Sequence, residues 1–296
     1  MRPLAVLASR VRYEEKRIFA ALERREVPYT HVDTRRFSVE LGDTAGGGPF
    51  FAAALNREIS HSRALYASLL LEARGVATVN RSDVIEMCGD KLRTSLALER
   101  AGVPSPRTAV ALSPDEGADA AERLGFPVVI KPLAGSWGRL VAAAHDRDTA
   151  EALLEHRAAL PSPVQHIVYL QEFVDKPGRD IRMIVAGDDV VGATYRYSDS
   201  WRTNAARGGR SKPCPLVPEL VAAALAAARA VGGGVLGVDL VEGPDGPLVL
   251  EVNHAVEFQG FQAAHGDTVD VADAIVAYAI SAAEQNDDHV PLREAQ

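Results

Sequence analysis

The feature that most constrains the fold is a strongly apolar stretch over residues 235–254 that nevertheless carries carboxylates. It reads V-L-G-V-D-L-V-E-G-P-D-G-P-L-V-L-E-V-N-H, which predicts two strands joined at a Gly-Pro-Asp-Gly turn. So apolar a strand pair belongs in a core, where an ionised carboxylate is costly unless it is paired or binds a metal. The stretch therefore predicts a buried hairpin that carries a site.

Three oxygen-bearing side chains of this hairpin are predicted to converge. Glu251 and Asn253 are two residues apart and share one face of a strand. A loop from Gly243 to Pro247 would place Asp239 opposite Glu251. Oxygen ligands of this kind suit Mg²⁺, which takes one or two carboxylates together with substrate phosphates. The alternative is a solvated hairpin face whose charges are incidental.

Composition narrows the class of protein. The 296 residues are 47% hydrophobic and 24% charged, which is typical of a globular chain with two or three packed units. The net charge of −8 argues against broad nucleic-acid binding, so an acidic partner must meet a local basic patch. Cys88 and Cys214 match no metal-ligand spacing and suggest no disulfide framework. With neither a signal peptide nor a membrane span indicated, a cytoplasmic protein without a membrane partner is expected.

The first 90 residues alternate between strand and helix patterns, which indicates an α/β layer. A glycine-rich loop at 44–49 lacks a nucleotide-binding fingerprint and is expected to be an ordinary surface loop. Strands are expected at 4–8, 29–32 and 76–79, with helices at 13–25 and 61–74.

Two lysines in the next segment lie where an anion could bind. Lys131 ends the apolar strand 128–130 and is followed by a loop with Gly135, Ser136 and Gly138, whose backbone N–H groups could approach a phosphate. Lys91 begins a helix over 91–101 that Asp90 can cap. The alternatives are an ordinary Gly-Ser turn and a surface lysine.

The rest of the chain mixes strands, helices and one long polar segment. The polar segment 198–215 is arginine-rich and lacks periodicity, and loops of that length are often functional. Further strands are expected at 142–144, 168–174, 183–185 and 190–197, and helices at 115–124, 149–160, 218–231 and 269–283.

These features together resemble the ATP-grasp superfamily, and most closely its LysX-type ligases. The strings that carry the resemblance are I-E-M-C-G-D-K, K-P-L-A-G-S-W-G-R-L, Q-E-F-V-D-K-P-G-R-D-I-R, T-N-A-A-R-G-G, V-G-G-G-V-L-G-V-D-L and E-V-N-H-A-V-E-F. The resemblance implies an α/β and α+β chain: an N-terminal Rossmann-like (preATP-grasp) domain over 1–90, a central ATP-grasp lobe with a lid loop over 91–165, and a C-terminal lobe with the metal site over 166–296.

The resemblance also implies roles for individual residues. Arg182 and Arg207 would be catalytic, and Asp239, Glu251 and Asn253 would bind Mg²⁺, as two ions. ATP would be bound by Lys91, Lys131, Gly135, Ser136, Trp137, Gly138, Arg139, Leu140, Gln171, Glu172, Phe173, Val174, Asp180, Arg182 and Asn204, with backbone groups of 171–174 meeting adenine. The amino-acid substrate would meet Arg196, Asn204, Arg207, Glu257, Phe258, Gly260 and Phe261.

Ligases of this family act on a small acidic amino-group carrier protein, LysW, and are often homo-oligomers. ATP phosphorylates the side-chain carboxylate of the carrier's C-terminal glutamate, and the amine of an amino acid then displaces phosphate. The Gly260–Phe261 pair resembles members that use glutamate rather than 2-aminoadipate, although Phe261 could equally be a core residue. Ala205 and Ala255 depart from the family's usual threonine, which leaves the substrate open. The alternatives are a RimK-type ligase that adds glutamate to another protein C-terminus, and an inactive nucleotide-binding subunit.

Overall fold

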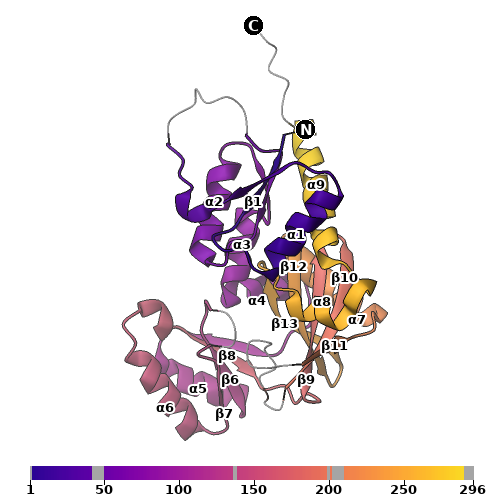
Figure 1. Ribbon diagram of the computed structural model, residues 1–296. Coiled ribbons are helices and arrows are strands. Elements are labelled where there is room, and N and C mark those ends of the chain that lie inside the picture. The colour runs from indigo at the N-terminus through magenta and orange to yellow at the C-terminus, as the bar shows by residue number, and fades with distance from the viewer. Residues whose placement is uncertain (1, 42–49, 136–138, 199–200, 202–209, 290–296) are drawn as a thin grey trace.

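The computed structural model describes residues 2–41, 50–135, 139–198, 201 and 210–289. Within them the chain builds three sheets, each covered by helices (Figure 1). The expected mixture of an α/β layer with antiparallel ATP-grasp lobes is confirmed.

The first sheet is parallel, with strand order β2-β1-β3-β4. Its central strand β1 is buried on both faces, as expected for a parallel sheet between helical layers. Leu4 and Val6 pack in the core formed with α1 and α9, whereas Ala5 and Leu7 pack against α2. The elements are β1 (Leu4–Leu7), α1 (Tyr13–Arg24), β2 (Tyr29–Val32), β3 (Ala53–Asn56), α2 (His61–Glu72), β4 (Ala77–Val79) and α3 (Ser82–Gly89).

Strand β3 was not expected from the sequence, although it lies between β1 and β4. Its segment, Ala-Ala-Leu-Asn, has few β-branched residues, so its propensity for strand is weak and burial decides its structure.

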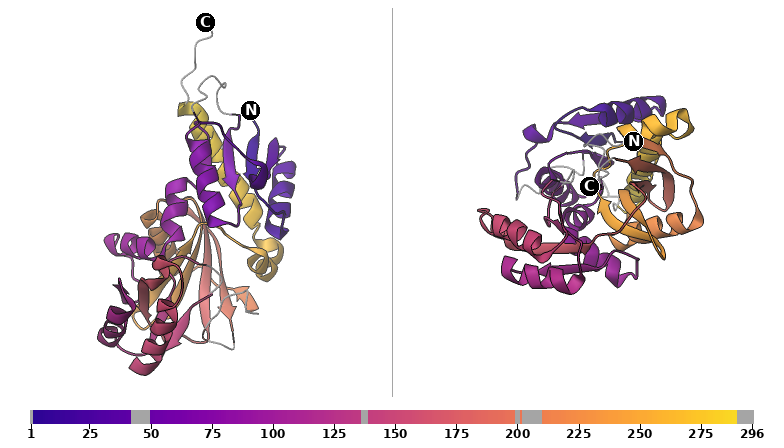
Figure 2. Two further views of the ribbon diagram at one scale, coloured as in Figure 1. Left: turned by 90° about the vertical axis from the view of Figure 1, so that its left-hand side faces the viewer. Right: turned by 90° about the horizontal axis from the view of Figure 1, so that it is seen from below.

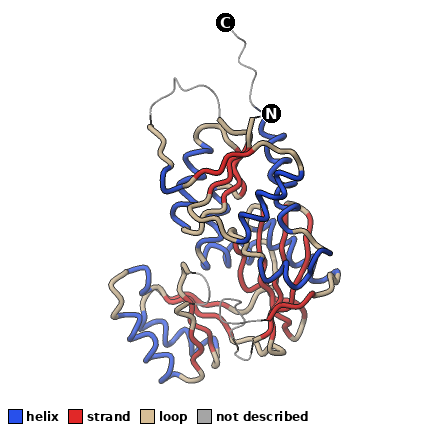
Figure 3. Tube along the Cα trace, viewed as in Figure 1, coloured by secondary structure: helices blue, strands red, loops and turns tan. Residues whose placement is uncertain are grey.

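The second sheet is antiparallel, with order β5-β8-β6-β7, and packs against α5 and α6. These helices lie on the side of the sheet away from the third sheet, as the helix and strand colours show (Figure 3). The elements are α4 (Lys91–Arg100), β5 (Thr108–Ala111), α5 (Pro114–Leu124), β6 (Val128–Lys131), β7 (Ala142–Ala144), α6 (Arg147–Ala158) and β8 (Val168–Glu172).

The third sheet is antiparallel, with order β11-β10-β9-β12-β13. Alternate residues of its central strands face α7 and form an apolar core, among them Met183, Leu236 and Val238. The opposite face carries the charged residues described below. The elements are β9 (Arg179–Ala186), β10 (Asp189–Tyr197), β11 (Arg210–Pro213), α7 (Pro218–Ala230), β12 (Val235–Gly243), β13 (Gly246–Asn253), α8 (Gln259–His265) and α9 (Val271–His289).

The β12–β13 hairpin has a tighter turn than expected and a compensating bulge. Gly243 pairs with Gly246, so the turn holds two residues instead of five. Such a register alone would not pair Asp239 with Glu251. A shift between Asp239 and Leu240 inserts one extra residue in β13 and restores that pair. The expected pairing is thus confirmed, by a different backbone route.

Helix α9 leaves the third sheet and packs on the first domain (Figure 2). It contacts α1, β3 and β4. At the surface, Arg25 forms two hydrogen bonds of 2.7 Å with Asp273. Elements from both ends of the described chain therefore complete one domain.

Candidate active site

The charged face of the third sheet is set by strand register. Asp239 on β12 lies directly opposite Glu251 on β13 and Arg182 on β9. Arg196 on β10 lies opposite Asp180 on β9. Directly opposed residues point to one face of a sheet, so these five side chains share the face away from α7.

Asp239 is the centre of this cluster and is almost completely buried, at 5% exposure. Its Oδ1 lies 2.8 Å from Arg182 Nε and 2.8 Å from Arg196 Nη2, and its Oδ2 accepts a hydrogen bond of 3.3 Å from Asn253 Nδ2. Within the described residues, Oδ1 has no well-directed hydrogen bond. Burial raises the pKa of Asp239 even though the two arginines act to lower it.

Arg182 and Arg196 are both held in place. Arg196 makes a two-pronged contact with Asp180, at 2.6 and 3.0 Å. Burial alone would lower the pKa of Arg196, but Asp239 and Asp180 overcome that effect and raise it. A Cβ atom at Gly237 would clash with Arg182 Nη1. The absence of a side chain at Gly237 therefore leaves space for the Arg182 guanidinium over β12.

Lys91 connects helix α4 to the hairpin. Asp90 caps α4 by accepting hydrogen bonds from Leu92 N and Arg93 N, as predicted. The Lys91 ammonium donates to Glu251 Oε1 at 3.0 Å and to the Gly135 carbonyl at 3.2 Å. Burial acts to raise the pKa of Glu251, but the nearby Lys91, Lys131 and Arg182 lower it overall.

Lys131 ends β6 and donates a hydrogen bond to Gln171 Oε1 on β8. Burial lowers the pKa of Lys131 to about 8, against the attraction of Glu251 and Asp239. A partly desolvated ammonium whose hydrogen-bond partner among the described residues is the neutral Gln171 can bind a phosphate oxygen.

The segment expected to meet adenine is partly engaged within the protein. Gln171 is buried and its side chain contacts Lys131 and Thr108, at 3.3 Å for the latter. The backbone N–H groups of Glu172 and Phe173 donate to the carbonyls of Arg107 and Pro127. Adenine contacts from these two residues would therefore use carbonyl groups, and the role of Val174 stays a prediction.

Several predicted residues lie outside the described part of the chain, namely Ser136, Trp137, Gly138, Asn204 and Arg207. Arg139 and Leu140 are described and exposed at the start of the segment that leads into β7. The structure thus brings together the two lysines, Gln171, the Asp180–Arg196 pair, Arg182 and the three proposed metal ligands.

Of the residues predicted to select the amino acid, Glu257 lines a cavity together with Arg182 and Glu251, whereas the other three are not brought to the charged cluster. Phe258 and Phe261 are buried in the core shared by the first domain and α9. The Phe261 ring packs on Gly192 of β10 and stacks on His265 at 4.6 Å between centroids. Gly260 lies in the first turn of α8 near Ser211. Their roles in specificity remain a prediction, and the core placement fits the alternative given for Phe261.

A cavity of about 210 Å³ adjoins the charged cluster and contains residues that the sequence did not single out. It is lined by Arg182, Glu251 and Asn253 and also by Arg12, His61 and His254. His61 Nδ1 lies 3.4 Å from His254 Nε2. Burial, with smaller effects from His61 and Arg57, lowers the pKa of His254 to about 4, so it is neutral near pH 7.

Cys88 also lines this cavity. Burial, reinforced by the charge of Glu251, raises the pKa of its thiol to about 12. A thiol that stays protonated near neutral pH is a poor nucleophile, so the site does not suit a thioester mechanism.

The proposed metal ligands fit Mg²⁺ better than a transition metal. The described residues contain no cluster of three His, Cys, Asp or Glu side chains that could hold an ion by themselves. Two carboxylates and an amide, with Asp239 Oδ1 lacking a directed hydrogen bond, are a ligand set that phosphate oxygens would complete.

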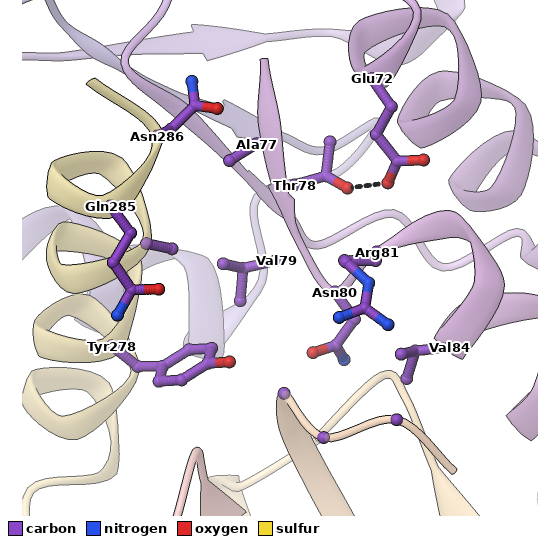
Figure 4. A pocket seen from close by; sticks show the side chains of 14 residues that line it. Glu72, Ala77, Thr78, Val79, Asn80, Arg81, Val84, Tyr278, Gln285 and Asn286 are labelled. Atoms are coloured by element: carbon purple, nitrogen blue, oxygen red, sulfur yellow. Dashed lines mark hydrogen bonds between the residues drawn. The ribbon is translucent and has the colours of Figure 1, made fainter. Parts of the chain in front are cut away.

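A second cavity, of about 320 Å³, lies between β4, α9 and residues 232–234 (Figure 4). Polar groups in it are already engaged. Thr78 donates to Glu72, and Asn80 Nδ2 donates to the carbonyls of Val235 and His254 at 2.7 Å each. This cavity contains none of the lysines or carboxylates of the charged cluster and belongs to the junction between the first domain and the third sheet.

Two lobes that bring lysines against a carboxylate-bearing hairpin define an ATP-grasp ligase. The RimK-like ATP-grasp domain model matches residues 88–279, and the LysX preATP-grasp domain model matches residues 4–87. The chain belongs to the RimK-like ATP-grasp family and has a LysX-type first domain. It is accordingly an ATP-dependent ligase that joins a carboxylic acid to an amine.

Curated relatives support this placement over nearly the full length. A glutamate–LysW ligase, ArgX, of Sulfolobus acidocaldarius is 36% identical over 278 residues, which cover 93% of this chain and 97% of the relative. An α-aminoadipate–LysW ligase, LysX, of the same organism is 38% identical over 252 residues, covering 84% and 91%.

Solved structures agree on the fold. A RimK-domain ATP-grasp protein from Sphaerobacter thermophilus is 28% identical with a TM-score of 0.75, covering 94% of this chain and 99% of that one. The ATP-grasp ligase PsnB is 22% identical with a TM-score of 0.72, covering 95% of this chain and 100% of that one, and shows the shared fold alone. Across the described residues, no helix combines the length and apolar character needed to cross a membrane.

Proposed function

We propose that this ligase joins the α-amino group of glutamate, or of a related amino acid such as 2-aminoadipate, to the side-chain carboxylate of the C-terminal glutamate of a LysW-type carrier protein. Relatives named as glutamate–LysW and α-aminoadipate–LysW ligases support the acceptor. The observation that carries the proposal is the contact of 3.0 Å between Lys91 and Glu251, which connects α4 to the acidic hairpin.

In the first step, the carrier carboxylate attacks the γ-phosphorus of ATP. A carboxylate O–P bond forms, the bond from the γ-phosphorus to ADP breaks, and an acyl phosphate results. Lys91 and Lys131 would hold the phosphates, and Arg182 would face the transferring group. Such a reaction depends on positioning and charge neutralisation rather than on covalent help from the protein.

In the second step, the amino-acid amine attacks the acyl carbon. The C–N bond forms, the C–O bond to phosphate breaks, and phosphate leaves. The incoming ammonium group loses two protons overall, one to solvent and one to the departing phosphate. A buried site excludes water, which would otherwise hydrolyse the acyl phosphate.

Asp239, Glu251 and Asn253 would hold Mg²⁺, as two ions in the resemblance stated above. The ion would supply charge neutralisation at the phosphate oxygens. Lys91 forms an ion pair with Glu251 in the structure. The lysine and the metal ion would therefore both contact the Glu251 carboxylate once phosphate is bound.

The choice of amino acid rests on the resemblance of Gly260 and Phe261 to glutamate-using members. One methylene separates glutamate from 2-aminoadipate, which limits discrimination to roughly 10- to 200-fold. We infer glutamate as the preferred substrate, to be measured as the ratio of kcat/KM for the two amino acids.

The test is carrier-dependent turnover. Purified protein with ATP, Mg²⁺, glutamate and a LysW-type carrier should release ADP and add the mass of one glutamate residue to the carrier. ADP release that needs glutamate but not the carrier would refute the proposal.

A second acceptor class has support from another relative. A probable α-L-glutamate ligase of Shewanella amazonensis is 34% identical over 286 residues. Replacing the carrier by other protein C-termini would distinguish a RimK-type ligase, which would accept them, from a carrier-specific one. No turnover with any acceptor would favour an inactive nucleotide-binding subunit.

A further inference from the structure

The cavity of about 210 Å³ extends the phosphate site toward the first domain. Arg182, Glu251 and Asn253 contribute to it from the third sheet, and Arg12 and His61 from the first domain. The volume is below the roughly 300–1,000 Å³ typical of drug-sized ligands, so it suits a single residue of a substrate rather than a folded surface.

Arg12 is held as a fixed donor at this cavity. Its Nε and Nη2 donate to Glu15 at 3.0 Å each. Glu15 is fully buried and lies 3.3 Å from Arg57, which in turn donates to the Val256 carbonyl at 2.8 Å. This network fixes the plane of the Arg12 guanidinium.

The remaining nitrogen of Arg12 meets a carboxylate that a ligand could replace. Nη1 donates to Glu257 Oε1 at 2.8 Å, and the Glu257 side chain is 48% exposed. Arginine recognises carboxylates through charge-assisted hydrogen bonds, and a pre-fixed guanidinium loses little entropy on binding one. An incoming carboxylate can therefore compete with Glu257 for Nη1.

Two arginines on one small cavity match a ligand with two carboxylates. Arg12 comes from the first domain, whereas Arg182 lies beside the proposed phosphate site. The last residue of a protein that ends in glutamate carries a backbone α-carboxylate and a side-chain carboxylate. An internal glutamate carries only the second.

We propose that Arg12 binds the free α-carboxylate of the acceptor protein's last residue and thereby directs its side-chain carboxylate to Arg182 and Lys91. This inference rests on the proposed function and adds the basis on which a terminal glutamate is distinguished from an internal one. His61 and His254, which also line the cavity, form part of its wall.

The first test needs no protein variant. A carrier with its natural C-terminus is compared with the same carrier bearing a C-terminal α-carboxamide, which keeps the side-chain carboxylate. Loss of one charge-assisted hydrogen bond should lower kcat/KM for the amide by roughly 10- to 100-fold. Equal use of the two carriers would overturn the inference.

The second test places the effect on Arg12. Arg12→Gln should lower kcat/KM for the free-acid carrier and remove most of the preference over the amide, with the KM for ATP unchanged. Lys16→Gln is the matched control, because Lys16 is exposed in the first turn of α1, the helix that Arg12 precedes, and its replacement removes the same charge. Glu257→Gln removes the competing carboxylate and should lower the KM for the free-acid carrier.

The outcomes separate this inference from the proposed function. Wild-type protein without any carrier-dependent turnover refutes the function. Carrier-dependent turnover with an Arg12→Gln enzyme that still prefers the free acid refutes the role of Arg12 alone. Thermal unfolding of Arg12→Gln shows whether it folds, and the amide comparison on the wild-type enzyme decides the inference even where it does not.

Discussion

Two buried carboxylates of this molecule, Glu58 in the first domain and Asp239 on the third sheet, differ in how their charge is stabilised. In the first domain, Glu58 accepts hydrogen bonds from Ser9 N at 3.1 Å, Ser9 Oγ at 3.0 Å and Ser60 N at 2.9 Å, and another from Thr34 Oγ1. Burial acts to raise the pKa of Glu58, but these donors lower it overall. The carboxylate is saturated by groups of its own domain.

In the charged cluster at the third sheet, by contrast, burial works against the charged forms of two side chains. Burial raises the pKa of Asp239 and lowers that of Lys131 to about 8, so each charge is held at a cost in the folded state. Hydrogen bonds from neutral donors surround Glu58, with Arg63 at 3.5 Å, whereas Asp239 Oδ1 lies 2.8 Å from each of two arginine nitrogens and has no well-directed hydrogen bond among the described residues. We infer from this difference that Glu58 serves the fold, whereas Asp239 is available as the proposed ligand of a metal ion.

The largest expected effect tests the charged cluster. Asp239→Asn should lower kcat by roughly 10²- to 10³-fold, the range seen when a group that organises transition-state charge is removed. The unfolding midpoint should fall as well, because the buried guanidinium groups of Arg182 and Arg196 lose a carboxylate partner, and removing one partner of a buried ion pair costs about 3–5 kcal/mol. ADP release and thermal unfolding measure both, with the exposed turn residue Asp245→Asn as the control. Retained activity in Asp239→Asn would contradict the proposal that Asp239 binds a ligand.

The next effect tests the saturated region. Glu58→Gln replaces one acceptor oxygen by an amide that cannot accept from the surrounding donors, and each buried donor left unpaired costs about 1–3 kcal/mol. We expect destabilisation of the first domain by about 2–4 kcal/mol, with kcat nearly unchanged in the fraction that stays folded. Urea unfolding measures this against Glu99→Gln, an exposed change on α4. A larger loss of activity than of stability would assign Glu58 to the site.

A smaller effect concerns the pH dependence of ATP use. Because the pKa of Lys131 is lowered to about 8, kcat/KM for ATP should fall with an apparent pKa near 8 as the ammonium loses its proton. Lys131→Met should have a low kcat/KM without that alkaline limb. The pH profile of both proteins at saturating carrier and amino acid is the measurement. An identical limb in the variant would assign it to another group.

The smallest effect is a rise of stability with pH in two separate pH ranges, one acidic and one alkaline. The folded pKa of Glu58 lies below its unfolded value, so its stabilisation is present above the unfolded value and is lost as pH falls through the folded one. The folded pKa of Lys131 is also lowered, so wild-type stability should rise with pH from about 8 toward the unfolded lysine value, relative to Lys131→Met. Unfolding midpoints across the two pH ranges test this, and a flat difference in either would contradict it.

The sequence predicted the hairpin and its face because period-2 alternation and turn residues are local signals. It could not predict the bulge that pairs Asp239 with Glu251, since that depends on fit to the neighbouring strand. Strand β3 was missed because an alanine-rich segment has weak strand propensity and owes its structure to burial, and β5 was missed because it is only four residues long and half of them are alanine. Helix α8 was also missed, since it is short and has no capping signal.

Within the site, the sequence predicted those residues that lie in a recognisable motif. It did not predict residues that only the tertiary structure brings together. Lys91, Lys131 and the hairpin residues were recognised by their strings. Arg12 carries no motif, and its network with Glu15 and Arg57 joins positions up to 42 residues apart, with a further bond to the carbonyl of residue 256. A charged residue flanked by apolar ones at helix spacing, as Glu15 is, was the available signal.

The packing of α9 on α1 and β3 has a consequence for how the polypeptide reaches its native state. The two residues of the Arg25–Asp273 ion pair are 248 positions apart. During synthesis the parallel layer emerges first but lacks one of its covering helices until almost all of the intervening lobes have left the ribosome. Those lobes can form their antiparallel sheets from contiguous chain beforehand. Assembly of the nucleotide-binding halves is thus expected to precede closure of the domain that is translated before them.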